Sequence, residues 1–267
     1  NKPPGISSQQ AVSRVKRLTG CKKAGHTGTL DPLATGLLLV AVGRATRLCQ
    51  YFLEGDKGYR AEIQFGAATD TGDREGRVIG TAQNFSFSSE QIAAVLAQFQ
   101  GLIDQVPPAA SALKIDGQRA FNLFRQGQTP EMPVRQVYIK SIAMLQDTGV
   151  DDANPILRID VLCSKETYIR SLAGDIGVAL GCPAHLAALT RTQISQISLS
   201  QAATFADLER NYSPWLLDMA IAVDKLPKLQ VGGENRQFFL QGRQLAAYGY
   251  EGEVAVFSGS SLLGIAR

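Results

Sequence analysis

Two stretches of this chain, far apart in the sequence, alternate apolar and polar residues with a period of two. Over residues 59–65 the pattern places Tyr59 and Phe65 on one face and Arg60 on the other, and residues 156–163 repeat the alternation. Successive side chains of a β-strand point to opposite faces of a sheet. Both stretches are therefore predicted to be strands, the first with one face in water.

Other segments show the apolar spacing of amphipathic helices. The first of these follows Ser7 and Gln10, which have the spacing of a capping box, and it ends before Gly20. The predicted helices are residues 8–19, the segment between Ser88 and Gly101, and residues 169–180, 204–210 and 214–222. Further strands are predicted at residues 78–81 and 134–145. Strands and helices joined by long non-local connections favour an α+β domain built on a sheet.

Composition restricts the class of protein and its domain organisation. The 267 residues suggest one large domain, or a large domain and a small one. With 45% hydrophobic and 19% charged residues, the chain is unlike a disordered one. The apolar run 37–42 is far shorter than a membrane span. After Pro227, short apolar pieces separated by glycines predict a small, mostly β domain over residues 228–267, following a first domain over residues 1–227.

Charge is concentrated near the beginning of the chain. Residues 1–60 contain ten basic and three acidic side chains, a net charge of +7, whereas the rest of the chain carries −4. Such a segment suits a polyanionic partner, although a solvated basic face is an equally good reading of charge alone. The four cysteines form no CxxC pair, and no apolar signal segment is present, so a cytoplasmic location is expected.

Several common chemistries lack the residues that they need. The chain contains no GxxxxGK[ST] phosphate-binding loop and no GxGxxG after a strand. Cys163, Cys182 and His185 could be considered as zinc ligands, but a structural site needs four ligands, so no metal is predicted. Neither of the two histidines lies near a GxSxG motif, which gives a serine hydrolase little support.

Asp31 is the candidate for a reactive group. It lies between Leu30 and Pro32 in a segment, 25–36, that has three glycines and no regular period, and this is typical of a structured loop. Asp31 could simply belong to an Asp-Pro turn. Alternatively it is a nucleophile in an apolar pocket, where a cation such as Arg170 would keep it ionised against desolvation.

The segment Gly25–Gly36 closely resembles the GHxGxLDPxATG signature of the TruB-type tRNA pseudouridine synthases, which act on the T-loop uridine at position 55 of tRNA. The resemblance extends along most of the chain. Its further blocks are Lys2–Ser8, Lys57–Arg60, Thr69–Gly76, Ser111–Lys114, Cys163–Arg170 and Leu189–Thr192. It implies a mixed, mostly antiparallel sheet with flanking helices, and a small C-terminal PUA-like RNA-binding domain that ends early here.

The resemblance also implies roles for individual residues. Asp31 would be the nucleophile paired with Arg170, and Tyr59 would stack on the uracil and act as the base at C5. The base pocket would be walled by Tyr168 and Leu189. His26 would fill the space that the extruded uridine leaves in the T-loop, because a stacked nucleotide cannot reach a pocket. Lower-ranked RNA contacts are Lys2, Lys22, Lys23 and Lys114.

The same resemblance implies a monomer that acts on the tRNA T-arm without a cofactor or metal. Residues 104–133, which contain four prolines, correspond to a segment that closes over the tRNA. Two residues depart from the family pattern. Glu166 replaces a glycine, so either no positive φ is needed there or the neighbouring tyrosine shifts, and its carboxylate could compete for Arg170. Phe121 replaces a tyrosine and removes one hydroxyl.

Two other functions remain open at this point. The chain could be a tRNA-binding or folding module whose aspartate has no chemical role, a reading that Glu166 motivates. It could also be a small-molecule carboxylate hydrolase, which the +7 segment makes hard to accept. The order of the bond-making steps does not follow from the residues.

Overall fold

The computed structural model describes residues 1–145, 149–245 and 249–267. Its largest element is a seven-stranded sheet in the order β15-β14-β4-β13-β11-β8, with β2 paired to the outer part of β14. The strands are β2 (Thr35–Gly36), β4 (Lys57–Phe65), β8 (Gly101–Gln105), β11 (Arg135–Met144), β13 (Ile156–Cys163), β14 (Ala184–Ile194) and β15 (Ile197–Ser198). Within this sheet, as far as the structure describes it, the β2–β14 pairing is parallel and the others are antiparallel. The predicted α+β class with a mostly antiparallel sheet is confirmed.

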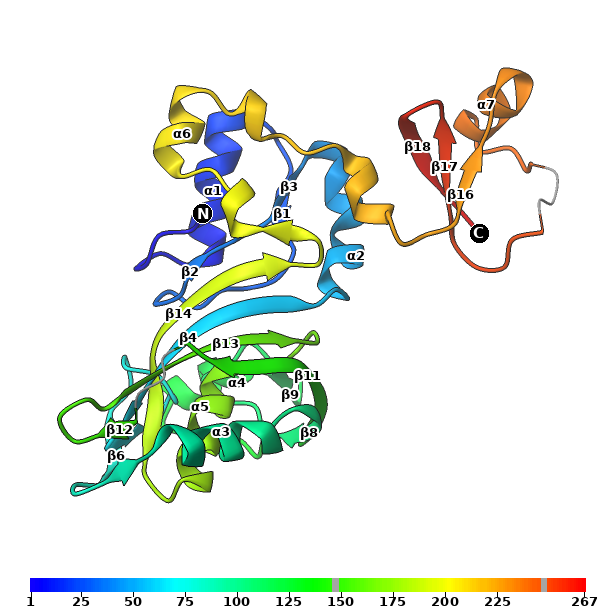
Figure 1. Cartoon of the computed structure of the whole chain (residues 1–267). Helices are drawn as coiled ribbons and strands as arrows, with labels where there is room; N and C mark the ends of the chain where they lie inside the picture. The colour runs from blue at the N-terminus through cyan, green and yellow to red at the C-terminus, as the bar shows by residue number, and fades with distance from the viewer. Residues whose placement is uncertain (146–148, 246–248) are drawn as a thin grey trace.

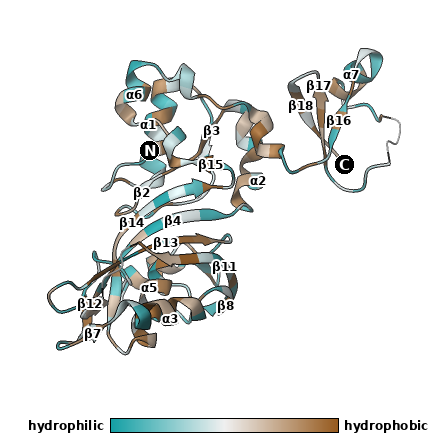
Figure 2. Ribbon diagram, viewed as in Figure 1, coloured by the Kyte–Doolittle hydropathy of each residue, from teal (hydrophilic) through white to brown (hydrophobic). Residues whose placement is uncertain are grey.

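Alternation along β4 and β13 produces the two faces that the sequence predicts. Ala61 and Ile63 are fully buried, whereas Arg60 pairs with Asp160 across the strands on the opposite face, with Nε 2.9 Å from Oδ1. The buried face is covered by α3 (Ser89–Gln98) and α5 (Ile169–Ala179), whose apolar residues join the main core (Figures 1 and 2). This sheet and its two helices form the frame on which the candidate site is built.

A second group of elements, from the beginning of the chain, lies on the β14 side of the main sheet (Figure 1). The helix α1 (Ser8–Thr19) begins at a complete capping box, as predicted, and packs on a hairpin of β1 (Ala24–His26) and β3 (Val40–Val42). This group also contains the 3₁₀ helix η1 (Gly43–Leu48) and the helix α2 (Cys49–Leu53). Four short strands lie at the margin of the sheet: β5 (Ala67–Thr69), β6 (Val78–Thr81), β7 (Ser86–Phe87) and β12 (Val150–Asp151).

The 104–133 segment contains short regular elements. These are β9 (Lys114–Ile115), β10 (Gln118–Arg119) and α4 (Ala120–Arg125). The segment after the sheet holds the helix α6 (Phe205–Arg210) and three short 3₁₀ helices, η2 (Leu199–Gln201), η3 (Ser213–Trp215) and η4 (Met219–Val223). The prediction of one helix over 214–222 is wrong. Residues 215–219 all line one pocket, and helical geometry would spread consecutive side chains around the axis.

A small three-stranded unit ends the chain and stands apart from the main sheet (Figure 1). It contains β16 (Lys228–Gln230), α7 (Gly233–Leu240), β17 (Val254–Ser258) and β18 (Ser261–Ala266). Its contact with the rest of the chain includes an apolar cluster of Ala255 and Phe257 with Val223, Leu48 and Tyr51. The Tyr51 hydroxyl also donates a hydrogen bond to Oε2 of Glu253 at 2.9 Å. Among the described residues, no helix combines the length and apolar character needed to cross a membrane.

Candidate active site

Asp31 and Arg170 form an ion pair at the centre of the candidate site. The Oδ2 atom of Asp31 lies 3.0 Å from Nε of Arg170. The arginine side chain is only 6% exposed, whereas that of the aspartate is 37% exposed. The carboxylate is therefore accessible to a bound molecule, while the cation that balances it is shielded.

Three separate segments hold the Arg170 guanidinium in place. Nη1 lies 3.4 Å from Oδ2 of Asp73 and donates to the carbonyl of Thr71 at 3.0 Å, and Nη2 donates to the carbonyl of Ala110 at 3.0 Å. Asp73 is itself buried and fixed, since its Oδ1 accepts hydrogen bonds from the Thr71 hydroxyl and a backbone N–H. A guanidinium held at all three of its nitrogens keeps one orientation toward Asp31.

The electrostatics of Asp31 balance burial against its neighbours. Burial raises the pKa of its carboxyl above the usual value, the Arg170 guanidinium lowers it, the Asp73 carboxylate raises it, and the Lys2 ammonium lowers it. The net direction is upward. Without Arg170 the carboxylate would face the cost of burial and the repulsion of Asp73 together.

The buried face of the sheet presents Tyr59 and Leu189 beside this pair. Strand register pairs Tyr59 with Arg191, and Ala61 with Leu189, so the three side chains of Tyr59, Arg191 and Leu189 share one face. Tyr59 is half-buried and Leu189 is 8% exposed. Burial raises the pKa of the Tyr59 phenol, and the Arg191 charge opposes that rise.

Tyr168 lies immediately before α5, one turn from Arg170. Its backbone is held on both sides by the Gln105 amide, which accepts from the Tyr168 N–H at 2.8 Å and donates to its carbonyl at 3.1 Å. Burial raises the pKa of its phenol; the Arg170 charge lowers that pKa and the Asp31 charge raises it. The structure thus brings two half-buried tyrosines to the Asp31 carboxylate.

His26 lies on β1, at the start of the loop that carries Asp31. Its Nδ1 accepts a hydrogen bond from the Gly28 N–H at 3.3 Å. Burial lowers the pKa of the imidazole, and the nearby Arg191 charge lowers it further. His26 is therefore held as a neutral ring at neutral pH, next to the loop that carries Asp31.

The basic residues predicted to contact RNA divide into two groups. Lys22, Lys23 and Lys114 are exposed. Lys2 is not: it is 2% exposed, and its ammonium donates to the carbonyls of Ile6 and Pro32 at 2.8 and 3.2 Å. The Lys2 ammonium therefore joins two loops beside Asp31, and its contact with RNA stays a prediction.

The two departures from the family pattern have clear structural settings. Glu166 has a φ of 64°, so the backbone there does adopt the left-handed conformation that glycine favours. Its carboxylate pairs with Arg135 at 2.6 Å, not with Arg170, and the expected competition is therefore wrong. Phe121 lies on α4 with the Arg125 guanidinium 5.5 Å from its ring centre.

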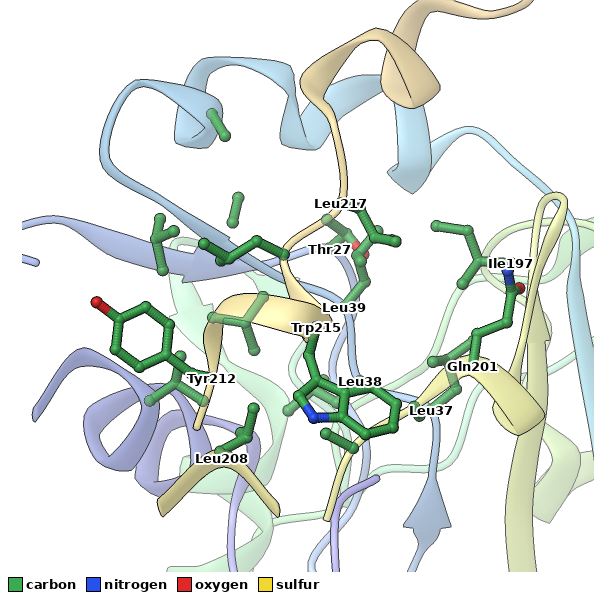
Figure 3. Close-up of a pocket in the computed structure, with 18 of the residues that line it drawn as sticks. Thr27, Leu37, Leu38, Leu39, Ile197, Gln201, Leu208, Tyr212, Trp215 and Leu217 are labelled. Atoms are coloured by element: carbon green, nitrogen blue, oxygen red, sulfur yellow. The ribbon is translucent and has the colours of Figure 1, made fainter. Parts of the chain in front are cut away.

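An apolar pocket of about 220 Å³ lies behind the Asp31 loop and is separate from the ion pair. Figure 3 shows Leu37, Leu38, Leu39 and Trp215 among the side chains that line it. Among the residues that the structure describes, no three His, Cys, Asp or Glu side chains are grouped as metal ligands.

The sequence missed three residues that support the site: Asp73, Gln105 and Arg191. Asp73 and Arg191 belong to the sequence blocks Thr69–Gly76 and Leu189–Thr192, but a single aspartate or arginine in the sequence does not indicate which partner it will contact. Gln105 lies at the beginning of the proline-containing segment and carries no local signal. Each acts through a partner at least 60 residues away in the sequence.

Comparison with known proteins gives consistent matches. Residues 16–169 match the family model described as TruB family pseudouridylate synthase (N terminal domain), and residues 170–225 match the tRNA pseudouridylate synthase B C-terminal domain. A tRNA pseudouridine synthase B of Ralstonia nicotianae is 44% identical over 282 residues, covering 100% of this chain and 88% of the relative. One of Bordetella pertussis is 46% identical over 229 residues, covering 85% and 91%.

Solved structures resemble the whole chain more distantly. The archaeal box H/ACA sRNP Nop10–Cbf5 complex contains a chain with 26% identity and a TM-score of 0.71, covering 99% of this chain and 76% of that one. A Cbf5–Nop10–Gar1 complex gives 27% identity and a TM-score of 0.72, covering 99% and 75%.

Proposed function

Because this chain belongs to the TruB family of pseudouridylate synthases, we propose that it isomerises the T-loop uridine at position 55 of tRNA to pseudouridine. As a tRNA pseudouridine synthase it is an isomerase. The reaction breaks the N1–C1′ bond of a uridine, forms a C5–C1′ bond, and moves one proton from C5 to N1. No water is consumed, so a second carboxylate to activate water is unnecessary.

The Asp31–Arg170 pair is the observation that carries this proposal. A carboxylate that is partly exposed, and held ionised by a buried guanidinium, suits a nucleophile that must release its adduct again. Tyr59 and Tyr168 offer aromatic faces to a uracil beside that carboxylate, and Leu189 offers an apolar wall. Tyr59 is the residue that we assign as the base at C5.

The position of the carboxylate supports a base-flipping step. Asp31 lies in a loop packed against the sheet, and a base stacked in an RNA helix cannot reach it. We infer that the uridine leaves the T-loop and that His26 takes up the vacated space. The charge near this loop also suits RNA, because Lys22 and Lys23, which come shortly before the loop in the sequence, are exposed.

The remaining assignments extend the proposal to the whole chain. Residues 1–227 would form the catalytic domain and residues 228–267 a PUA-like domain that contacts tRNA. The 104–133 segment would close over the substrate, since Ala110 already contacts Arg170. The protein would act as a monomer in the cytoplasm.

The test is incubation with an unmodified T-arm stem-loop, followed by carbodiimide mapping of pseudouridine. The wild type is expected to modify the single target uridine, and a stem-loop with cytidine at that position gives no signal. Asp31→Asn is expected to abolish product while RNA affinity stays within about twofold. Normal turnover by that variant would overturn the assignment of the nucleophile, and RNA binding without any product in the wild type would overturn the proposed site.

A further inference from the structure

Arg191 lies in the interior with no acidic partner. Arg191 is only 1% exposed. Within the described part of the chain, no carboxylate lies at ion-pair distance from its guanidinium. The guanidinium instead donates to three backbone carbonyls: Nε to Leu37 at 2.8 Å, Nη1 to Thr29 at 3.3 Å and Nη2 to Gly28 at 3.2 Å. A buried cation is costly unless a partner uses its charge.

Those three carbonyls lie on both sides of Asp31 in the sequence. Gly28 and Thr29 precede the aspartate and Leu37 follows it, so one side chain holds both ends of the catalytic loop. The backbone of Arg191 adds a further contact, because its carbonyl accepts from the Leu37 N–H at 2.8 Å. The position of Asp31 therefore depends on a residue of the central sheet.

The same side chain lies beside the Tyr59 phenol. Arg191 and Tyr59 are directly paired on adjacent antiparallel strands, which places their Cβ atoms about 5 Å apart on one face. Burial raises the pKa of that phenol, and the Arg191 charge opposes that rise. The unpaired cation thus has a use: it favours negative charge on the Tyr59 oxygen.

We propose that Arg191 is a positioning residue for the isomerisation, which fixes the Asp31 loop against the sheet and stabilises the ionised Tyr59 oxygen that accepts the C5 proton. Because the pKa of the Tyr59 phenol is raised overall, the phenol first releases its proton to solvent. The phenolate then takes the proton from C5 and becomes a neutral phenol again, while N1 of the product takes up a proton from solvent. This inference rests on the proposed function, and it gives a role to a group that does not touch the reacting atoms.

The ionisation of Tyr59 provides a readout that is independent of turnover. Protein labelled with 3-fluorotyrosine is titrated by ¹⁹F NMR, and Tyr59→Phe identifies the Tyr59 resonance by its loss. In Arg191→Gln the midpoint for Tyr59 is expected to rise by about one pH unit. The kcat for the T-arm stem-loop is expected to fall at least about tenfold with KM within about twofold, since the contacts matter during the reaction.

Arg60→Gln is the matched control, because Arg60 neighbours Tyr59 on the same strand but points to the opposite, exposed face. It is expected to leave both the titration and kcat unchanged. If Arg191→Gln does not fold, Arg191→Lys serves for the same comparison. Its single ammonium cannot hold the loop and the phenol together, so kcat falls at least about fivefold. A variant at Arg191 with wild-type kcat and an unmoved Tyr59 titration would overturn the inference.

The two proposals fail in different ways. If Asp31→Asn abolishes product while the Arg191 variants turn over normally, only the role of Arg191 is rejected. If Asp31→Asn turns over normally, the proposed function is rejected. A raised Tyr59 midpoint in Arg191→Gln would still establish the contact between the two side chains in that case.

Discussion

At the scale of single residues, Asp31 combines the chemical role that we propose for it with a cost to stability. The folded protein holds this carboxyl partly buried and beside Asp73, and its pKa is raised despite Arg170. Asp31→Asn removes the buried charge and leaves Arg170 with Asp73 and two carbonyls. We expect the melting temperature of this variant to equal or exceed that of the wild type while activity is lost. A drop of more than about 5 °C would indicate a structural role instead.

The raised pKa of Asp31 also predicts a pH dependence. Just above the ordinary value of 3.8 the unfolded chain has already released this proton, whereas the folded protein still binds it. The folded state binds more protons in that interval, so the contribution of Asp31 to stability falls as pH rises through it and is constant at neutral pH. Urea unfolding at several pH values should show this fall in wild type and not in Asp31→Asn. Activity, which needs the carboxylate, should change in the opposite direction.

Glu166 is a second residue whose cost can be measured. A left-handed conformation costs a residue with a side chain about 1 kcal/mol relative to glycine, and the exposed Glu166–Arg135 pair returns less than that. Glu166→Gly should therefore raise the melting temperature by about 2 °C. Glu166→Ala keeps the strain, loses the ion pair and should lower it. Calorimetry on the two variants gives the comparison, and an equal change in both would contradict the strain argument.

At the scale of elements, the contact between β2 and β14 positions the loop that carries Asp31. A Cβ atom on Gly36 would lie 2.4 Å from the carbonyl oxygen of Arg191, and φ at Gly36 is 99°. We expect Gly36→Ala to cost about 3 kcal/mol or more and to reduce kcat sharply, because the loop must move away from the sheet. Gly25→Ala, on β1 just before the loop, is the control: no atom of the surrounding structure lies within 4 Å of its added Cβ. Thermal unfolding of both variants tests this, and equal melting temperatures would contradict it.

The elements also show which parts of the fold could be predicted from sequence. The capping boxes at Ser7 and Ser88 are local, and both helices begin where they indicate. Strand β14 was not predicted, because its first four residues are all buried and show no alternation. The same limit applies to the site. Asp31 lies in one continuous motif, whereas Gln105 and Arg191 act through contacts that only the folded sheet creates.

At the scale of the whole molecule, the +7 charge of the first 60 residues is the property that RNA would meet, but the fold reduces the number of useful cations. Lys2 and Lys57 are buried, with their ammonium groups bound to carbonyls. Lys22 and Lys23 are exposed and free to approach phosphates. Affinity for tRNA should therefore fall steeply with added salt, because each neutralised phosphate releases counterions.

Replacing Lys22 and Lys23 by glutamine should reduce the slope of log affinity against log salt by about one for each lysine. Binding weakens while kcat at saturating RNA is unchanged, because neither side chain touches Asp31, Arg170 or Tyr59. Lys140→Gln is the control, since Lys140 pairs with Asp56 on the charged face of the sheet. Filter binding from 50 to 300 mM salt measures the slope for the wild type, for the protein with Lys22 and Lys23 replaced, and for Lys140→Gln. An unchanged slope in the Lys22 and Lys23 variants would move the RNA-binding surface elsewhere on the molecule, and a flat response in the wild type would argue against RNA as the substrate.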